Sequence, residues 1–337
     1  MKLQRLFVLV LCLTLAGPSA AAEINVYSAR IESLIKPLLD QFTEQTDIKV
    51  NLVTGEADAL LKRLELEGRN SPADLLITTD VGRLHQAETR GLLQAVESGV
   101  LHEQIPSAYR DPEGFWFGLS LRARVIAYAR ERVSADELST YEALADENWR
   151  GRVCIRSSSN VYNQSLVASL IAHNGVEATQ DWADGLVKNF ARSPQGGDRD
   201  QISAVAAGQC DLAVVNTYYI AGMLASPKQN EVNAAMTVGV FWPNQNRRGA
   251  HVNISGAGVT KAAKNKAEAI QLLEFMLSDE AQRWYADQNH EYPVKPGISV
   301  SNLLEQWGEF KADDLNLSTL GDNNAEAVRI MDRAGWR

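Results

Sequence analysis

The sequence is poor in the side chains that bind soft metal ions. Its 337 residues include three cysteines, five methionines and five histidines. No group of these residues has the spacing of a metal site, and the histidines are scattered along the chain as His85, His102, His173, His251 and His290. Transport of a soft metal is therefore disfavoured. Only His251 stands near a strand that we expect to cross between domains, so its lining a binding cleft is a minor alternative.

The common catalytic motifs are also absent. The chain has no His-Glu-x-x-His, no Gly-x-Ser-x-Gly and no Walker loop. The serines at 157–159 have no evident base partner and are better explained as a capping loop. We therefore expect a binding protein and not an enzyme.

Positive charge is in deficit. The chain has 33 Lys and Arg against 42 Asp and Glu, a formal net charge of −9. Residues 1–22 contain two basic and no acidic residues, so their removal would take the charge from −9 to −11. This balance argues against nucleic acid and against an anionic membrane surface as partners.

No hydrophobic run is long enough to span a bilayer as an anchor. The longest, 6–16, follows Lys2 and Arg5 and precedes an Ala-x-Ala cleavage site that ends at Ala22. We interpret 1–22 as a secretory signal peptide, without lipid attachment because Leu11 precedes Cys12. The remaining 315 residues (337 − 22) suggest about two domains of roughly 150 residues each in a periplasmic protein.

The mature sequence predicts an α/β fold. Apolar segments at 24–28, 48–53 and 73–78 are typical of strands, and helical periodicity follows each of them. This β-α-β-α order predicts a mostly parallel sheet covered by helices. A longer strand at 118–128 places Arg122 and Arg124 on one face. Strands that pass between two such halves would leave a cleft between two lobes.

One stretch of the second half, 211–222, reads as a short buried strand followed by a helix. Asn216 or Thr217 is the natural N-cap, so Tyr218 and Tyr219 fall in the first helical turn. The carboxyl ends of strands are where ligands bind in open α/β sheets. We call such a junction, in which a strand leads directly into a helix that carries tyrosine in its first turn, a tyrosine elbow. Two phenols at this elbow could reach one ion. The alternative is that one packs in the core and the other lies at the surface.

Tyr162 is presented in a similar way. Asn160 is the expected N-cap of a helix that follows a strand at 153–156, so Tyr162 lies in its first turn. Between the two tyrosine elbows, Asp198 with Gln201 is expected to cap the helix that ends at Gly208.

The two cysteines of the mature chain stand in matching places. Cys154 and Cys210 each head a strand that leads into a tyrosine elbow. Because disulfides persist outside the cytoplasm, we predict that they are bridged. Two buried free thiols are the alternative.

These segments resemble the ferric-ion-binding proteins of bacterial ABC iron importers, within the type II periplasmic solute-binding proteins. The resemblance covers most of the mature chain in collinear order, and its most specific motifs are Ser-Asn-x-Tyr-Asn and Asn-Thr-Tyr-Tyr-Ile-Ala-Gly. The segment at 277–282 is general to solute-binding proteins. The stretches that carry the resemblance are 26–30, 118–125, 141–144, 149–154, 157–163, 216–222 and 251–258.

The resemblance implies two α/β lobes with Fe(III) held in the cleft between them. Its metal ligands are Tyr162, Tyr218 and Tyr219, all on the second lobe. A first-lobe ligand is often found just after the Ser-x-Arg segment, but here 31–33 reads Ile-Glu-Ser. This departure points to the subgroup in which three tyrosines and a small anion such as carbonate, or water, complete the shell.

Arginines are implied for the anion. Arg122 or Arg124 is the expected anion partner, and the two stay open as alternatives, with Arg122 preferred. Arg30 is interpreted as a solvated side chain and Asp80 as a helix cap. A tyrosine-plus-anion site would release iron on acidification, because ligand and metal compete for protons.

The expected organisation is a signal peptide at 1–22, lobe 1 at 23–121 with 250–300, and lobe 2 at 122–249. A helical segment at 301–337 is left unassigned to either lobe. The implied partners are an ABC permease and its ATPase, with the chain itself a monomer. A receptor for an organic anion or a polyamine on the same fold is the competing function.

Overall fold

The computed structural model describes residues 22–337. The predicted signal peptide lies outside this range except for its last residue, Ala22, so the cleavage site stays a prediction. Within the described residues, no helix is both long enough and apolar enough to cross a membrane.

The strands form one continuous sheet that joins two halves of the molecule. Their order is β2-β1-β3-β8-β4-β6-β5, with β7 and β9 also paired to β4. The bounds are β1 (Glu23–Ser28), β2 (Lys49–Thr54), β3 (Leu75–Thr79), β4 (Phe117–Ala129), β5 (Val153–Cys154), β6 (Leu212–Asn216), β7 (Val238–Phe241), β8 (Val252–Val259) and β9 (Tyr292–Pro293). We call the half built around β1–β3 lobe 1 and the half built around β5–β7 lobe 2.

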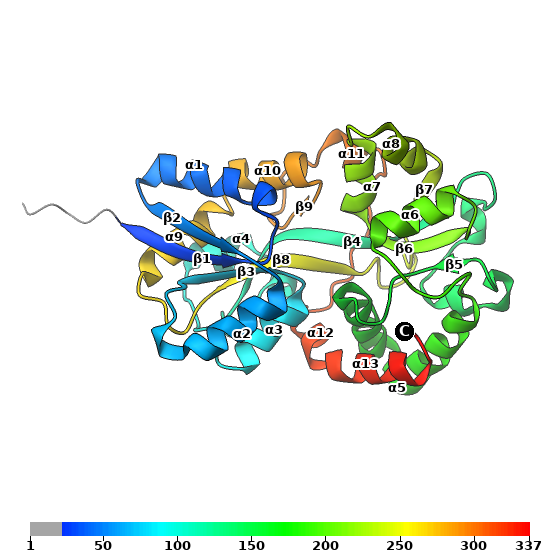
Figure 1. Cartoon of the computed structure of the whole chain (residues 1–337), viewed down its shortest axis with the longest axis horizontal. Helices are drawn as coiled ribbons and strands as arrows, with labels where there is room; N and C mark the ends of the chain where they lie inside the picture. Colours follow the sequence, from blue (N-terminus) through cyan, green and yellow to red (C-terminus); the bar gives the residue numbers. More distant parts are fainter. Residues whose placement is uncertain (1–21) are drawn as a thin grey trace, which may run out of the picture.

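Helices cover both faces of the sheet in each lobe. Figure 1 shows α1 and α10 on one face of the lobe 1 sheet, with α2 and α3 on the other. In lobe 1 the helices are α1 (Lys36–Thr46), α2 (Ala57–Glu67), α3 (Val81–Thr89), α4 (Gly99–Gln104), α9 (Lys266–Phe275) and α10 (Asp279–Asn289). In lobe 2 they are α5 (Val161–Lys188), α6 (Asp198–Ala206), α7 (Thr217–Leu224) and α8 (Gln229–Met236).

The C-terminal segment packs against both halves. It contains α11 (Asn302–Glu305), α12 (Ser318–Asp322) and α13 (Asn324–Arg333). Helix α13 packs along α5, and α12 contacts both α5 and α3. Short 3-10 turns complete the secondary structure, at Glu32–Leu34, Gly68–Asn70, Ser107–Tyr109, Ala135–Glu137, Glu142–Ala145 and Glu147–Trp149.

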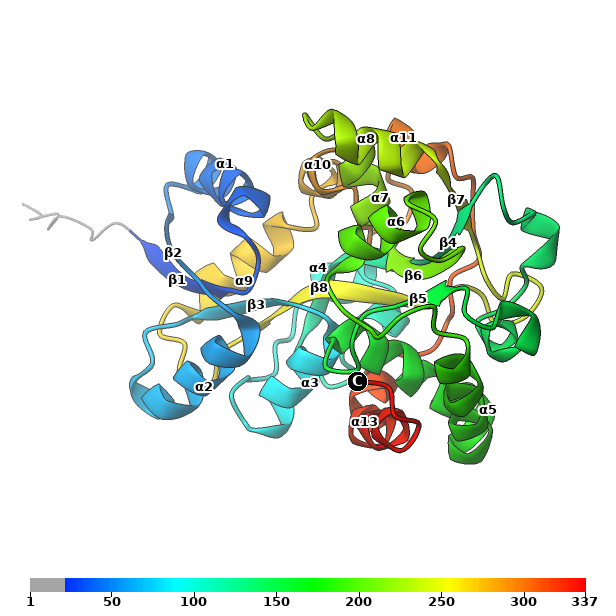
Figure 2. The same ribbon diagram turned by 45° about the vertical axis from the view of Figure 1, so that its right-hand side comes forward.

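Strand β4 changes partners part-way along its length. Up to Ala123 it pairs antiparallel with β8, and from Arg124 onward it pairs antiparallel with β6. The pairs β1–β2, β1–β3 and β5–β6 are parallel, as expected from the sequence. Figures 1 and 2 both show β4 and β8 running between the halves. The prediction of a two-lobed α/β fold is therefore confirmed, whereas the exact lobe boundaries stay a prediction.

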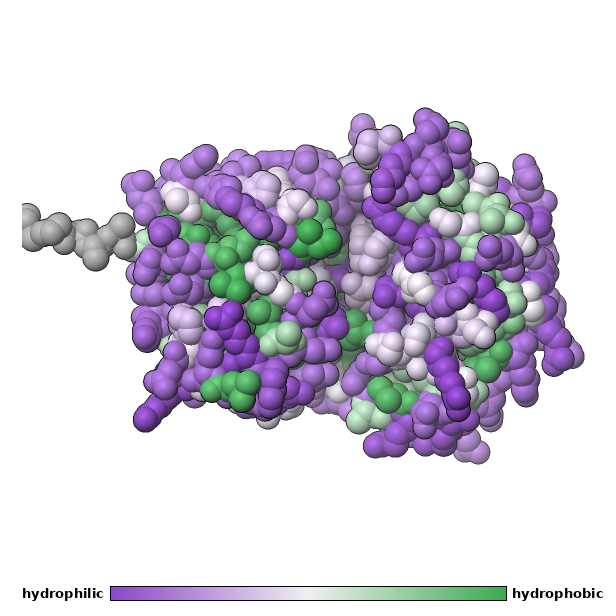
Figure 3. Space-filling view, in the orientation of Figure 1, coloured by the Kyte–Doolittle hydropathy of each residue, from purple (hydrophilic) through white to green (hydrophobic). Residues whose placement is uncertain are grey.

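Apolar side chains are buried in two clusters. The larger contains the strands and helices of lobe 1 and extends along α5 and α13, with Trp116, Trp149 and Trp336 among its largest members. The smaller lies within lobe 2 and includes Val125 and Val215. On the face shown in Figure 3 hydrophilic residues dominate, and hydrophobic ones appear as separate spots.

The predicted disulfide is confirmed. The Sγ atoms of Cys154 and Cys210 are 2.08 Å apart, and both residues are buried in the lobe 2 cluster. Cys154 ends β5, and Cys210 lies two residues before β6, so the bridge links two neighbouring strands whose ends lead to the tyrosine elbows.

The prediction for Asp198 is wrong in one respect. Helix α6 begins at Asp198, but its N-cap is Gly197, and Asp200 supplies the carboxylate that accepts the Gly197 N–H at 2.6 Å. Asp198 is 1% exposed and bonds instead to groups outside its own helix. Its carboxylate accepts from Arg156 and from the Asn216 backbone N–H, in the site described below.

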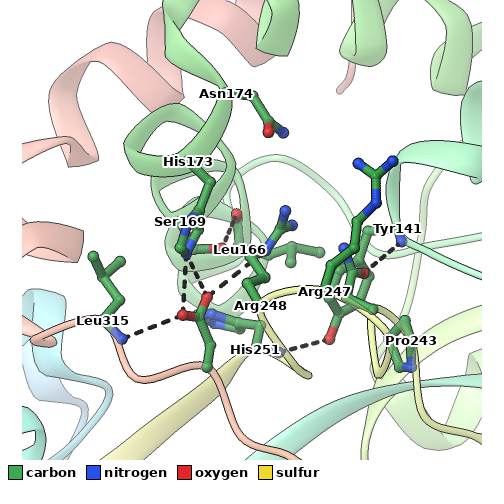
Figure 4. Close-up of polar contacts among 12 residues, drawn as sticks. Tyr141, Leu166, Ser169, His173, Asn174, Pro243, Arg247, Arg248, His251 and Leu315 are labelled. Carbon is green, nitrogen blue, oxygen red and sulfur yellow. Dashed lines mark hydrogen bonds and ion pairs between the residues drawn. The ribbon is translucent and has the colours of Figure 1, made fainter.

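His251 lies away from the cleft, so the alternative that it lines a binding site is wrong. It is 2% exposed, and its backbone N–H donates to the Tyr141 hydroxyl at 3.0 Å. Figure 4 shows it beside Arg248, near the pair that His173 forms with Asp313 at 2.8 Å. Burial, aided by the charges of Arg124 and Arg248, lowers the pKa of His251 to about 3.

We predict that replacing the disulfide lowers stability strongly. The bridge closes a loop with a sequence separation of 56 residues, so the Cys154→Ala/Cys210→Ala protein should lose about 4 kcal/mol of unfolding free energy. Urea unfolding of the metal-free mature protein measures this. Thiol counting on the denatured, unreduced protein is the control, and finding two free thiols would rule the bridge out.

We also predict that His251 makes the fold sensitive to acid. An unfolded imidazole takes up a proton below about pH 6.5, whereas folded His251 stays neutral down to about pH 3. Between these values the unfolded state binds more protons, so stability falls as pH falls. From pH 6.5 to 5, His251→Gln should remove about 2 kcal/mol of this loss. His102→Gln, at an exposed histidine, is the control; equal pH profiles for the two variants would contradict the prediction.

Candidate metal centre

Tyr218 and Tyr219 lie where the sequence placed them, at the start of a helix that follows a buried strand. Asn216 ends β6 and is the N-cap of α7, and the two tyrosines are the second and third residues of that helix. Their ring centroids are 4.2 Å apart at an angle of 34°. Both side chains are half-buried. The elbow therefore brings two adjacent phenols to the same side of the chain.

Tyr162 joins them from a second helix. Asn160 is the N-cap of α5, and Tyr162 is the second residue of that helix. The Tyr218 hydroxyl donates to the Tyr162 hydroxyl at 3.3 Å. All three phenols line one cleft of about 820 Å³, which also takes residues from lobe 1. Side chains 56 residues apart in sequence are thus brought together by two strand-to-helix elbows.

The environment keeps Tyr218 and Tyr219 protonated when no metal is bound. Burial, followed by the neighbouring Tyr162 and Tyr219, raises the pKa of Tyr218 well above its ordinary value. Burial also raises the pKa of Tyr219, with Tyr162 and Asp198 adding to the shift. Arg122 acts in the opposite direction on Tyr218. A cation bound here would have to displace phenolic protons.

Arg122 faces the phenols. It is 2% exposed and lines the cleft, and its guanidinium carbon lies 5.7 Å from the Tyr162 ring centroid and 5.9 Å from that of Tyr218. One of its terminal N–H groups donates to Ser255 Oγ. Its buried Nε has no hydrogen-bond partner among the described residues. Arg122 therefore presents an unused donor close to the tyrosines.

Arg124 has a different environment, although it is only two residues further along β4. It donates to Asn163 Oδ1 at 2.7 Å and to Asn216 Oδ1 at 3.1 Å, and it lies 3.5 Å from Asp198. It does not line the cleft. Asn163 and Asn216 belong to the two tyrosine elbows. Arg124 therefore links the elbows by hydrogen bonds on the side away from the cleft.

Asp198 is the acidic centre of this supporting layer. Its carboxylate accepts from Arg156 at 2.7 Å and from the Asn216 backbone N–H at 3.0 Å. The Arg156 guanidinium carbon is 5.7 Å from the Tyr162 ring centroid. Neither Asp198 nor Arg156 was expected at the site, because no sequence motif marks them; their roles follow from the packing of α6 against β6.

The interpretation of Arg30 as a solvated side chain is wrong. Arg30 is 4% exposed, pairs with Glu291 at 3.1 Å and donates to the same Ser255 hydroxyl as Arg122. The next residue, Ile31, is 70% exposed. The lobe 1 wall of the cleft thus includes Arg30 with its bonded partner Glu291, beside Asp287 and His290.

The charges around the phenols leave an excess of at least one positive charge. Four guanidinium groups face three carboxyl groups, and burial raises the pKa of one of these, Asp80. The guanidinium groups are those of Arg30, Arg122, Arg124 and Arg156, and the carboxylates are those of Asp80, Asp198 and Glu291. An oxyanion beside the phenols would balance this charge.

Other places in the molecule fit a metal less well. Within residues 22–337, no group of three or more His, Cys, Asp or Glu side chains is placed to hold a metal ion. A hollow of about 870 Å³ lies on lobe 2 beside β7, lined by Trp242 and Glu142 among others. Glu142 already bonds to Asn244 at 2.8 Å and to Arg248. This hollow contains none of the three tyrosines, so the cleft is the candidate site.

Comparison with known proteins places the chain among transport proteins. Residues 70–313 match the family model described as bacterial extracellular solute-binding protein. The chain is 50% identical to "Iron uptake protein A1" of Synechocystis sp., over 95% of this chain and 89% of that protein. It is 28% identical to the "Major ferric iron-binding protein" of Neisseria meningitidis serogroup B, over 99% of this chain and 98% of that protein.

Solved structures agree with these relatives. A Trichodesmium protein in complex with iron and citrate ligands matches with a TM-score of 0.92 and 49% identity, over 94% of this chain and all of that chain. The ferric iron-binding protein A of Mannheimia haemolytica in an open conformation matches with a TM-score of 0.87 and 40% identity, over 94% and 99%. The fold and family predicted from the sequence are confirmed: the chain belongs to the bacterial extracellular solute-binding proteins.

Proposed function

We propose that this chain captures ferric iron with the phenolates of Tyr162, Tyr218 and Tyr219 and delivers it to a membrane permease. The observation that carries the proposal is the meeting of three phenols in one cleft between the lobes, with two hydroxyls 3.3 Å apart. The function is that of a binding protein, in line with relatives that are transport proteins and not enzymes.

The donor set suits a hard, trivalent cation. Phenolate oxygens are hard ligands, and hard ligands prefer hard cations. Three phenolates neutralise Fe(III), so the metal and its ligands carry no net charge. The excess positive charge around the cleft then remains for an anion, and Arg122, which lines the cleft, offers an unused N–H group beside the phenols. Carbonate, or another small carboxylate, has the planar oxygens that a guanidinium binds well.

The structural position of Arg124 leads us to base the anion proposal on Arg122 alone. Arg124 uses its N–H groups on Asn163, Asn216 and the Val214 carbonyl. It supports the tyrosine elbows and does not face the cleft. Its substitution would therefore disturb the ligand geometry in addition to any effect on an anion.

An organic anion or a polyamine is the competing ligand class on this fold. A polyamine would need several free carboxylates in the cleft. Glu291 is already paired with Arg30, and Glu231 with Arg199 and Lys228, so Asp287 is the one unpaired carboxylate of the cleft lining among the described residues. An organic anion would use Arg122 and Arg30 but would have no need of three clustered phenols. The tyrosine cluster therefore favours ferric iron over both alternatives.

The setting of this activity follows from the family, whose members work outside the cytoplasm with ABC transporters. Relatives include an "Fe(3+)-binding periplasmic protein" of Serratia marcescens. We propose that the mature chain acts as a periplasmic monomer after removal of residues 1–22. It would pass iron to a permease driven by an ATPase.

Loss of one phenol should weaken iron binding sharply. Chelated ferric ion added to the metal-free protein should produce a visible phenolate charge-transfer band that saturates at one iron per chain. Tyr219→Phe removes a ligand, so its affinity in chelator competition should fall by at least about a hundredfold. Tyr128→Phe, on β4 outside the cleft, is the matched control. Absence of a band in the unmodified protein, or a Tyr219→Phe protein that binds as tightly, would contradict the proposal.

The anion should act through Arg122. Iron retention by the unmodified protein should rise with bicarbonate concentration, because the bound oxyanion completes the metal shell. In Arg122→Gln the charged hydrogen bonds are lost, so iron retention should fall by about tenfold or more and become insensitive to bicarbonate. Arg69→Gln, at an exposed arginine, is the control. A bicarbonate response that persists unchanged in Arg122→Gln would exclude this role.

A further inference from the structure

Lobe 1 is held against the tyrosine helix by a buried hydrogen bond. Ser165 Oγ, on α5 of lobe 2, donates to Asp80 Oδ1, at the start of α3 in lobe 1, at 2.8 Å. Ser165 is 1% exposed and Asp80 is fully buried. The two residues are 85 positions apart in sequence. The contact therefore joins α5 of lobe 2 to the start of α3 in lobe 1.

The other hydrogen bonds of Asp80 are all to groups of lobe 1. Its backbone N–H donates to the Ile254 carbonyl of β8 at 2.9 Å, and its Oδ1 accepts the Gly82 N–H at 2.9 Å. Its Oδ2 accepts from Asn253 Nδ2 at 2.8 Å, and Asn253 Oδ1 in turn accepts the Val81 N–H. The carboxylate is thus fixed in direction, with Ser165 as its one hydrogen-bond partner from the opposite lobe among the described residues.

The backbone at Asp80 supports a role beyond helix capping. Its φ of 84° and ψ of 128° lie in a region that non-glycine residues rarely adopt. Such a conformation costs about 1–3 kcal/mol and persists where the surroundings enforce it, often at functional sites. The residue is also a buried acid without an ion pair within the described residues. Serine or asparagine would cap α3 without burying a carboxyl group, so capping alone does not account for Asp80.

Ser165 lies close enough to Tyr162 in the sequence for its hydrogen bond with Asp80 to affect the position of that tyrosine. It follows Tyr162 by three residues on α5, so the two side chains lie on neighbouring positions of one helix face. Tyr162 in turn faces Arg122, which pairs with β8 of lobe 1 through Asn253. The hydrogen bond therefore fixes the first turns of α5 relative to the wall that carries Arg122.

We propose that Asp80 and Ser165 form an interlobe latch that positions Tyr162 against Arg122 and keeps lobe 1 closed over the loaded site. The need for such a contact follows from the lobe 1 wall, where Arg30 is paired with Glu291 and Ile31 is exposed. With no metal ligand contributed from that segment, iron alone would not pull lobe 1 onto the site. The inference rests on the proposed function, because it takes Tyr162 as a ligand.

Ser165→Ala tests the latch, with Ser169→Ala as the matched control. Ser169 is also a buried serine of α5, but its hydroxyl donates within the helix to the Leu166 carbonyl at 2.7 Å, as Figure 4 shows. Each variant is loaded with ferric ion, and the rate of iron loss to a competing chelator is followed by the visible band. Because Ser165→Ala removes a buried hydrogen bond between the lobes, it should lose iron roughly tenfold faster at the same band position. Ser169→Ala should match the unmodified protein.

Small-angle scattering supplies a readout that does not depend on the band. The iron-loaded Ser165→Ala protein should be more expanded than the loaded Ser169→Ala protein, although both keep their ligands. Equal rates of iron loss and equal scattering radii for the two variants would overturn the latch while leaving the tyrosine site intact. A lack of any band in the unmodified protein would instead overturn the proposed function. In that case the latch would be tested by the scattering radii of the metal-free Ser165→Ala and Ser169→Ala proteins. Equal radii would refute it.

Discussion

The site depends on the point at which strand β4 leaves one lobe and enters the other. Ala123 still pairs with β8, whereas Arg124 already pairs with Asn216 of β6. Two arginines on the same side of one strand are thereby divided between two tasks. Arg122 faces the cleft from the lobe 1 ladder, and Arg124 braces the tyrosine elbows from behind. A shift of β4 by one residue would exchange inward and outward side chains and destroy both arrangements.

The tyrosines are held by a layer that never reaches the cleft. Arg124 donates to Asn163 of one elbow and to Asn216 of the other, and the Asp198 carboxylate accepts the Asn216 N–H. The disulfide joins β5 to the segment before β6, the two strands that lead into these elbows. Each elbow is therefore fixed by hydrogen bonds and by covalent linkage before a metal arrives. Such preorganisation reduces the ordering that metal binding would otherwise require.

Local signals in the sequence predicted most of what is local in the structure. The N-caps Asn160 and Asn216 place the tyrosines in their first helical turns. The matching places of Cys154 and Cys210 before the two elbows made their bridge predictable, although Cys154 ends its strand and does not head it. What failed depends on tertiary contacts. A capping motif suggested the wrong N-cap for α6, because the cap is Gly197, whose N–H Asp200 accepts. The burial of Arg30 depends on Glu291, 261 residues away, which no periodicity reveals.

The central claim is that three phenolates of lobe 2 and an anion on Arg122 form the ferric shell, without a ligand from lobe 1. A crystal structure of the iron-loaded protein, with anomalous scattering recorded at the iron edge, tests it most directly. We predict one iron peak bonded to the hydroxyl oxygens of Tyr162, Tyr218 and Tyr219, with an oxyanion between the metal and Arg122. An iron peak bonded to His290, Glu291 or another lobe 1 side chain, or a peak away from the tyrosines, would contradict this account.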